Sequence, residues 1–341
     1  MTLLTYLDRM MAREDLSAHD AEEAMSTILG GEATTPQIAA FLVALRMKGE
    51  TAQEILGFAR AMRAKAARVD VRLSGELLVD TCGTGGDRSG TFNISTISAF
   101  VAAGAGARVA KHGNRSISSR CGSADVMEGL GVKIALAPEQ MARAIREVGI
   151  AFLFAPVIHV AMKHAQPARL ELRTRTVFNI LGPLTNPAGA QAQLVGAPDE
   201  HAAELMAETL AALGLTRGFV AHGSDGLDEI TTTGPSLLIE IAGGTVTHRT
   251  VGPEDFGVPC ARKADLLGGD LEANCEIARE VLGGARGPRR DVVLVNASAA
   301  LVAAGRARDF REGVAMAMES IDSGAARRRT EDLARFTQQF G

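Results

Sequence analysis

The run GTGGD at residues 83–87 places three glycines and an aspartate between an apolar segment that ends at Asp80 and a helix that we expect to begin near Asn93. Glycine costs backbone entropy and is used where the chain turns at positive φ or comes close to a ligand. Backbone N–H groups freed in this way, next to a helix N-terminus, form a nest for anionic oxygens. The run fits neither GxxxxGK(S/T) nor GxGxxG. It predicts a phosphate or pyrophosphate site, because a plain strand-to-helix turn would need only one or two glycines.

A second polar cluster, KHGNRSISS at residues 111–119, follows a short apolar segment that predicts the next strand. Two cations, an imidazole, an amide and three hydroxyls in nine residues are more than a routine loop carries, although a solvated turn remains the alternative. Lys111 offers a point charge to a phosphate, and the serine hydroxyls offer donors. Ligands of open α/β sheets bind beyond the carboxyl ends of the strands, so we expect this cluster beside the glycine run.

Residues whose oxygen atoms could bind a metal ion occur in two segments of the sequence. Asn93 and Ser95 are ordinary helix N-caps by type, but beside a phosphate they become donors, and Ser95 could ligate Mg²⁺. Asp228 and Glu229 follow the apolar segment at 218–222. Adjacent carboxylates at a strand end suit Mg²⁺ held through waters and substrate phosphates, whereas an ordinary surface pair is the commoner reading of such residues.

A looser group of His159, His164 and Arg169 lies in APVIHVAMKHAQPAR. A lone histidine on an apolar face is usually a structural residue. Arg169 is the stronger functional candidate because a guanidinium binds a carboxylate through two hydrogen bonds. A structural ion pair explains it equally well from the sequence alone.

Composition limits the class of protein. The 341 residues are 46% hydrophobic and 22% charged with a net charge of −4, which is typical of a globular protein and gives no field that would attract nucleic acid. Four cysteines without a CxxC pair indicate neither a zinc site nor a disulfide framework and favour a cytoplasmic location. We expect no signal peptide and no membrane span, because no apolar run reaches about 18 residues.

The elements that must position these residues fall into two parts. Residues 1–66 predict helices only: Ser17 and Asp20 cap one, Thr35-Pro36 begins another, and Thr51 with Glu54 caps a third that runs to about Arg68. Short apolar runs then alternate with amphipathic segments; the runs lie at 77–80, 107–111, 150–154, 192–197 and 218–222. This alternation predicts an α/β domain with a mainly parallel central sheet covered by helices.

We therefore expect a small helical domain over 1–70 and a larger α/β catalytic domain over 71–341. After residue 237 the pattern predicts β-structure, and from about Leu271 it predicts helices. The segment HAQPARLELRTRTVFNIL at 164–181 is polar, basic and periodic, and it interrupts the alternation. We expect helices from 164–182 to return to the N-terminal helices.

Together these stretches resemble the anthranilate phosphoribosyltransferase family over nearly the whole chain. The resemblance is densest in motifs whose order is highly specific: GTGGD (83–87), GTFNIST (90–96), KHGNRSISS (111–119), FLFAP (152–156), RTVFNILGPLTNP (175–187) and GLDEI (226–230). It implies a homodimer that assembles through its helical part. It also implies transfer of a phosphoribosyl group from 5-phosphoribosyl 1-diphosphate to anthranilate, with Mg²⁺, in tryptophan biosynthesis.

The resemblance also implies the roles of single residues. Those that would hold 5-phosphoribosyl 1-diphosphate are Gly83, Gly86, Asp87, Thr91, Asn93, Ile94, Ser95, Thr96, Lys111, His112, Gly113, Asn114, Arg115, Ser116, Ile117, Ser118, Ser119 and Ser123. Gly83, Asn114 and Arg169 would hold anthranilate, with His112 a candidate for the wall of its pocket. Ser95, Asp228 and Glu229 would hold the metal. Lys111, Asn114 and Arg169 are the residues we expect to matter most for catalysis.

Two rival functions use the same kind of fold. One is nucleoside phosphorolysis, but the related pyrimidine phosphorylases resemble Lys-His-Ser where this chain has Thr81-Cys82-Gly83. The other is a non-enzymatic nucleic-acid-binding relative, which the net charge and the intact polar motifs disfavour. Activity on thymidine or uridine with phosphate would reveal the first, and a gel shift on DNA the second.

Overall fold

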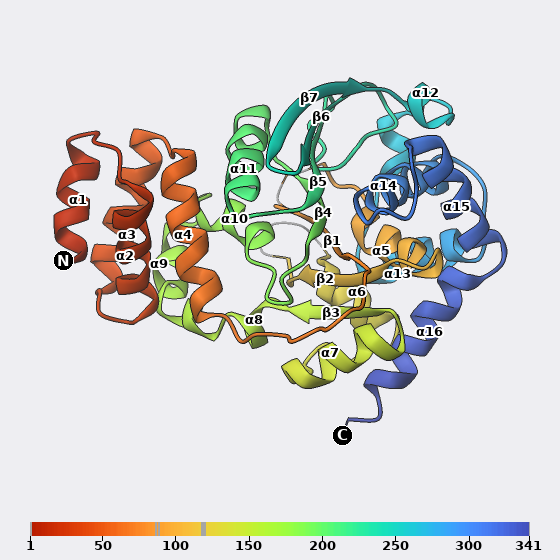
Figure 1. Cartoon of the computed structure of the whole chain (residues 1–341), viewed down its shortest axis with the longest axis horizontal. Coiled ribbons are helices and arrows are strands. Elements are labelled where there is room, and N and C mark those ends of the chain that lie inside the picture. The colour runs from red at the N-terminus through yellow and green to blue at the C-terminus, as the bar shows by residue number, and fades with distance from the viewer. Residues whose placement is uncertain (1, 86, 88, 117–120, 341) are drawn as a thin grey trace.

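The computed structural model of the chain describes residues 2–85, 87, 89–116 and 121–340 and shows a helical bundle beside an α/β part (Figure 1). The bundle begins with α1 (Leu3–Met11), α2 (Ala18–Leu29), α3 (Thr35–Lys48) and α4 (Ala52–Lys65). Ser17 accepts the backbone N–H of Asp20 at the start of α2, and Thr51 forms a capping box with Glu54 at the start of α4. Both caps confirm the sequence prediction.

Two boundaries of the bundle differ from the prediction. The N-cap of α3 is Thr34 rather than Thr35, because the Gln37 side chain accepts the Thr34 N–H and so closes the first turn one residue earlier. Helix α4 ends at Lys65 rather than near Arg68, since Ala66 is already extended at ψ 145°. Neither shift changes which helices form.

The α/β part is built on a seven-stranded sheet in the order β3-β2-β1-β4-β5-β6-β7. The strands are β1 (Leu78–Gly83), β2 (Arg108–Gly113), β3 (Ile150–Phe154), β4 (Ala192–Gly196), β5 (Arg217–Gly223), β6 (Ser236–Ala242) and β7 (Thr245–Val251). The first five are parallel, and β6 and β7 are antiparallel additions at one edge. The mainly parallel sheet is therefore confirmed.

Helices cover both faces of the sheet (Figure 1). One apolar core lies under α5 (Ile94–Gly104), α6 (Ser123–Gly129), α7 (Pro138–Glu147), α13 (Leu271–Leu282), α14 (Pro288–Ala303), α15 (Phe310–Asp322) and α16 (Ala325–Thr337). The other face is covered by α11 (Glu200–Ala212), which lies between the sheet and the bundle. The remaining short helices are α8 (Ala155–Ile158), η1 (Val160–His164), α9 (Gln166–Leu172), α10 (Phe178–Leu181), η2 (Gly182–Leu184), α12 (Pro253–Phe256) and η3 (Lys263–Leu266).

The second apolar core runs from the bundle onto the sheet without a break. Phe41 and Phe58 of the bundle belong to the same buried cluster as Val195 of β4 and Val220 of β5. Ala168 of α9, within the segment 164–182, is part of this cluster too. The bundle is thus packed against the α/β part by continuous apolar burial, the dominant favourable term in folding.

None of the helices that the structure describes is long and apolar enough to cross a membrane.

We predict that Glu54→Gln lowers the free energy of unfolding by about 1.5–3 kcal/mol, the usual range for charge-assisted hydrogen bonds. Glu54 is fully buried, and its carboxylate accepts the N–H groups of Leu16 (3.0 Å) and Thr51 (2.9 Å) and pairs with Lys48 (3.0 Å). An amide keeps the shape but faces Lys48 without charge. Urea unfolding measures the change.

The matched control is Glu208→Gln on the exposed face of α11, which should shift the free energy of unfolding by no more than about 0.5 kcal/mol. Equal effects of the two variants would contradict a special role for the buried carboxylate.

Candidate active site

The glycine run and the Asp228 loop are in direct contact at the carboxyl ends of β1 and β4. A Cβ atom on Gly196 would stand 1.6 Å from the backbone oxygen of Asp228, and one on Gly83 would stand 2.7 Å from its carboxylate. That carboxylate accepts the N–H of Gly85 (2.8 Å) and the hydroxyl of Thr84 (3.3 Å). The two glycines therefore permit a loop contact that any side chain would block.

Asp228 and Glu229 are buried, so the alternative of a solvated surface pair is excluded. Asp87 of the glycine run lies beside them, with its carboxylate accepting the N–H of Asp228 at 3.4 Å and that of Ser89 at 3.1 Å. Asn296 of α14 fixes the loop from the other side: its side chain accepts the N–H of Ile230 (3.0 Å) and donates to the Ile230 carbonyl (2.9 Å).

Lys111 joins the second strand to this cluster. Its side chain is only 1% exposed, and its ammonium donates to the Thr81 carbonyl and to the Ser95 hydroxyl at 3.3 Å. Ser95, in the first turn of α5, also lies near Glu229, and its hydroxyl favours the charged form of that carboxyl. The polar motifs that are far apart in sequence are thus brought together at one edge of the sheet.

The electrostatics of this cluster are set by burial. Burial, and then the neighbouring charge of Asp87, raise the pKa of Asp228 to about 7. Burial and then the charge of Asp228 raise the pKa of Glu229 to about 8. Lys111 is the cation that faces them, and burial lowers its pKa although the surrounding carboxylates oppose this.

These residues fit a magnesium ion. When Asp228 and Glu229 are ionised, they and Asp87 bring three negative charges together, an excess that a divalent cation would offset. The donors of Ser95, Asp228 and Glu229 are oxygens, which Mg²⁺ prefers. Among the described residues no group of three His, Cys, Asp or Glu side chains could form a metal cage by itself. Substrate phosphates and waters would have to complete the coordination of a Mg²⁺ ion held here.

Two buried histidines, His112 and His159, lie beside each other, and His112 directly follows Lys111 in the chain. Both rings are uncharged near neutral pH, because their pKa values are low. The His112 ring nitrogen Nδ1 lies 3.1 Å from the Gly182 carbonyl, which can only accept, so Nδ1 carries the proton. Burial lowers the pKa of His112 to about 3 and that of His159 to about 4. Their rings lie 5.1 Å apart, and neither Nε2 atom has a hydrogen-bond partner among the residues described.

Among the residues that the structure describes, no ion pair of Arg169 is found. Its guanidinium lies over the Phe178 ring at 5.2 Å. Burial lowers its pKa. The contact with Phe178 uses the face of the guanidinium and not its planar hydrogen-bonding edge, which is the part that binds a carboxylate.

The loop after β2 is held by its own side chains. The Asn114 carbonyl accepts the Ser123 hydroxyl at 3.2 Å, and the Asn114 side chain accepts the N–H of Arg115 at 2.8 Å. Arg115 forms ion pairs with Asp125 (2.6 Å) and Glu128 (2.7 Å), so its charge is already partnered. Gly113 is the last residue of β2, and Ser116 lies in the loop that follows it.

The remaining predicted residues are placed as follows. The Thr91 hydroxyl bonds to that of Ser89 at 3.0 Å, and Asn93 is the N-cap of α5. The side chains of Ile94 and Thr96 are buried, which leaves their backbone groups as their means of contact with a ligand. Gly86, Ile117, Ser118 and Ser119 lie outside the described residues.

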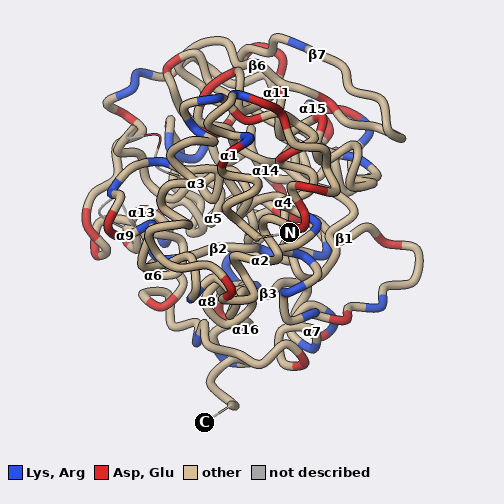
Figure 2. Tube along the Cα trace, turned by 90° about the vertical axis from the view of Figure 1, so that its left-hand side faces the viewer, with Lys and Arg blue, Asp and Glu red and all other residues tan. Residues whose placement is uncertain are grey.

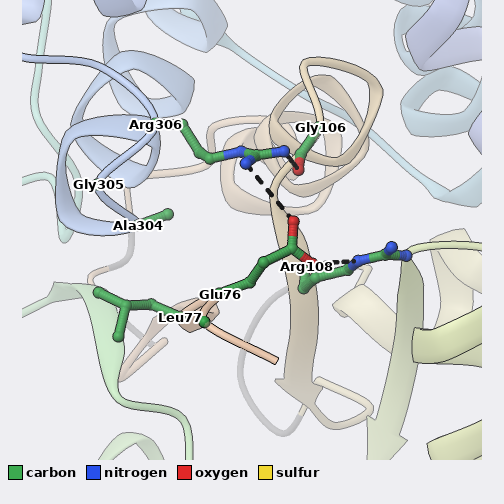
Figure 3. A pocket seen from close by; sticks show the side chains of 8 residues that line it. Glu76, Leu77, Gly106, Arg108, Ala304, Gly305 and Arg306 are labelled. Atoms are coloured by element: carbon green, nitrogen blue, oxygen red, sulfur yellow. Dashed lines mark hydrogen bonds and ion pairs between the residues drawn. The ribbon is translucent and has the colours of Figure 1, made fainter. Parts of the chain in front are cut away.

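The cavity in Figure 3 is a different place. It measures about 220 Å³ and lies at the amino ends of β1 and β2, where Glu76 pairs with Arg108 (3.1 Å) and Arg306 (3.5 Å). Its charged groups satisfy one another, and none of the predicted site residues lines it. The motifs meet at the opposite ends of these strands.

Sequence reasoning missed several residues that shape the site. Asp80 and Asn186 are buried beside His112, and Arg175 donates to the Gly85 carbonyl at 2.8 Å. Asn296 had a usable signal, because it is an amide within the apolar helix VVLVNASAALV. Asp80 had one too, as a charge at the end of a buried strand.

Two family models define the class of protein. A model described as glycosyl transferase family, helical bundle domain, matches residues 4–66, and one described as glycosyl transferase family, a/b domain, matches residues 75–327. The chain therefore belongs to this glycosyl transferase family.

Within that class the chain belongs to the anthranilate phosphoribosyltransferases. It is 64% identical to the anthranilate phosphoribosyltransferase of Solibacter usitatus over 98% of this chain and 99% of that one. It is 54% identical to the enzyme of Moorella thermoacetica, with 99% of both chains covered. The sequence-based resemblance is confirmed.

Two solved structures of anthranilate phosphoribosyltransferases also match this chain over nearly its whole length. The crystal structure of anthranilate phosphoribosyltransferase from Thermus thermophilus matches with a TM-score of 0.92 at 43% identity, covering 97% of this chain and 99% of that one. The Saccharomyces cerevisiae enzyme in complex with PRPP and Mg matches with a TM-score of 0.91 at 28% identity, covering 99% and 98%.

We predict that Mg²⁺ stabilises the protein more at about pH 8 than at about pH 6. Burial raises the pKa values of Asp228 and Glu229, so their contribution to stability is present below about pH 4 and is lost as the pH rises through about 7 to 8. Ionised carboxylates bind Mg²⁺, so the ion restores stability mainly in the upper part of this window. Calorimetric melting temperatures with and without Mg²⁺ measure it.

Asp228→Asn/Glu229→Gln is the control that separates these two carboxyls from all other titrating groups. In this variant the Mg²⁺-dependent shift in melting temperature should vanish at both pH values. A shift equal to that of the parent protein would place the metal elsewhere.

Proposed function

We infer that this protein transfers the phosphoribosyl group of 5-phosphoribosyl 1-diphosphate to the amine of anthranilate, giving N-(5-phosphoribosyl)anthranilate and pyrophosphate in tryptophan biosynthesis. The observation that carries this is the meeting of the glycine run, Lys111 and the Asp228–Glu229 pair at one edge of the sheet, in a chain that matches anthranilate phosphoribosyltransferases from end to end. Each of these groups has a task in the reaction.

The reaction breaks the bond between ribose C1 and pyrophosphate while the amine lone pair forms a bond to C1, and the positively charged nitrogen so formed then loses one proton to water. Negative charge grows on the leaving group, so donors already fixed around it lower the barrier. The Lys111 ammonium and the amides of the glycine run supply such donors. Mg²⁺, held by Ser95, Asp228 and Glu229, would neutralise further charge on the phosphates.

The nucleophile needs little activation. An aromatic amine is already neutral near pH 7, so the chain requires no strong general base, and its main contribution is to hold the two substrates in line. Gly83, Asn114 and Arg169 hold anthranilate in this proposal, and the neutral His112 forms part of the wall. In this proposal the phosphoribosyl diphosphate is held by Gly83, Gly86, Asp87, Thr91, residues 93–96, residues 111–119 and Ser123.

We also propose that the protein is a homodimer formed through its helical domain, which would take in the helices of 164–182 beside residues 1–70. Leu4 and Met11 on α1, and Val43 and Met47 on α3, are exposed apolar residues one or two turns apart. Met47 is 72% exposed, which is costly for an unpartnered surface. A mass of one chain by light scattering would contradict the dimer.

The cellular location and the partners of the protein are a further part of the proposal. We propose a cytoplasmic protein without a nucleic-acid partner, on the evidence of four free cysteines and a net charge of −4. Basic and acidic residues are intermixed along the described chain in Figure 2, where a nucleic-acid-binding surface would show a basic field.

The direct test is the loss of anthranilate fluorescence on mixing the protein with anthranilate, 5-phosphoribosyl 1-diphosphate and Mg²⁺. We expect the parent protein to consume anthranilate and Asp228→Asn/Glu229→Gln to be strongly impaired while it stays folded, with single variants partly rescued by more Mg²⁺. Thymidine or uridine with phosphate should give no product. Nucleoside cleavage without anthranilate consumption would replace this function by phosphorolysis.

We predict that Arg169→Ala raises the KM for anthranilate at least about tenfold, equivalent to about 1.4 kcal/mol, because a guanidinium–carboxylate contact is lost. The KM for 5-phosphoribosyl 1-diphosphate should hardly move, since its phosphates rest on other loops. Arg169→Lys should recover only part of the loss, because an ammonium cannot reproduce the planar pair of donors. Steady-state kinetics measure all three.

Lys163→Ala, at an exposed cation of the same segment, is the matched control and should leave both KM values unchanged. Equal weakening of both substrates by Arg169→Ala would make Arg169 structural, and an unchanged anthranilate KM would remove it from the site.

A further inference from the structure

Strands β1 and β2 separate at the end where the site lies. Their pairing covers only Leu78 with Arg108 and Val79 with Val109, although both strands continue for four more residues. Over those residues β1 stays paired with β4 as far as Gly83, and β2 stays paired with β3 as far as Gly113. The backbone groups that face each other across the opened gap need other partners.

Side chains supply those partners. The Asp80 carboxylate accepts the backbone N–H of His112 at 3.0 Å. Asn186, which enters the gap after η2, donates to Asp80 at 2.7 Å and to the Ala110 carbonyl at 2.9 Å. From β2 the Lys111 ammonium crosses to the Thr81 carbonyl of β1. The side chains of Asp80, Asn186 and Lys111 thus supply hydrogen bonds in place of the backbone pairs that β1 and β2 do not form here.

An aspartate at position 80 is not the residue that would make the folded protein most stable. It is fully buried, and the groups that donate hydrogen bonds to it are neutral: the His112 N–H, the Asn186 amide and the Cys82 thiol at 3.3 Å. The Lys111 ammonium nearby favours the charged form of Asp80, but burial still raises the pKa of this carboxyl, so an ionised carboxylate here costs free energy that a well-packed apolar side chain would avoid. The pair therefore calls for a role beyond packing.

The same pair determines where His112 stands. Asp80 holds the His112 backbone, and the Gly182 carbonyl holds its ring. Gly182 begins the short segment 182–186 that ends in Asn186, which also accepts the Ala188 N–H at 2.9 Å. Asp80 therefore fixes the backbone of His112 directly, and Asn186 anchors the segment whose Gly182 carbonyl fixes the ring.

We propose that Asp80 and Asn186 are positioning residues for phosphoribosyl transfer, which hold β1 and β2 apart and so fix the Lys111 ammonium and the His112 ring at the site. This rests on the proposed function, in which Lys111 faces the leaving group and His112 lines the anthranilate pocket. Neither residue touches substrate. Their effect on rate acts through Lys111 and His112.

Asp80→Asn tests the proposal, because its amide keeps an acceptor for the His112 N–H but sets an NH₂ group against that of Asn186. We expect kcat to fall at least about tenfold in the folded variant, with a smaller change in the KM for 5-phosphoribosyl 1-diphosphate. Imidazole ¹⁵N shifts of His112 should move, since the ring loses its fixed bond to Gly182.

In the double variant Asp80→Asn/Asn186→Asp, the amide at position 80 can again form a hydrogen bond with position 186, by donating to the carboxylate there. The double variant should therefore lose less activity than the product of the two single losses, as expected for residues in contact. Glu54→Gln is the matched control: it changes a fully buried carboxylate to an amide in the bundle, and should lower stability while leaving kcat within about twofold.

The proposal is overturned if folded Asp80→Asn keeps kcat and both KM values within about twofold, or if the two single losses multiply in the double variant. Should Asp80→Asn not fold, Asn186→Ala takes its place, with the same drop in kcat expected. If neither folds, the pair serves folding alone and the proposal is likewise overturned. A parent protein that consumes no anthranilate would instead refute the proposed function.

Discussion

The close approach of the Asp228 loop to the ends of β1 and β4 is the contact on which the site depends. Gly83 and Gly196 leave room for the backbone and carboxylate of Asp228, and no other residue could stand at Gly196, where a Cβ would lie 1.6 Å from a carbonyl oxygen. Through this contact the glycine run, the carboxylate pair and the first turn of α5 share one small volume. Asn296 holds the loop there from the opposite side.

Burial of like charges is the cost of that arrangement. Asp87, Asp228 and Glu229 lie close together, and the burial of Asp228 and Glu229 raises the pKa values of these two carboxyls toward neutrality. Such a cluster destabilises the free protein but would bind a divalent cation and its phosphate ligands well, because each ionised carboxylate would gain a partner it lacks. Under the proposed function, stability is thereby exchanged for affinity at the place where charge would develop on the leaving group.

The rest of the molecule makes this exchange possible. The apolar core of the helical bundle continues across α11 onto the sheet, so the polar edge is held by two large buried clusters. Arg63 of α4 donates to the Leu184 carbonyl at 2.8 Å, within the segment 182–186 that holds His112. The bundle is therefore tied to the site by a hydrogen bond as well as by apolar packing.

The sequence by itself predicted the helical bundle, the mainly parallel sheet and the residues that we propose bind phosphate and metal, because caps, periodicity and glycine runs are local signals. It placed the N-cap of α3 one residue late, since the competing cap, Thr34, differs only through the Gln37 side chain. Whether Asp228 and Glu229 were surface charges, and whether Arg169 had an ion pair, stayed open until the fold was known. Only the tertiary structure decided these points, and only it revealed Asp80 and Asn186, because burial and the separation of β1 from β2 arise from contacts between residues more than 100 positions apart.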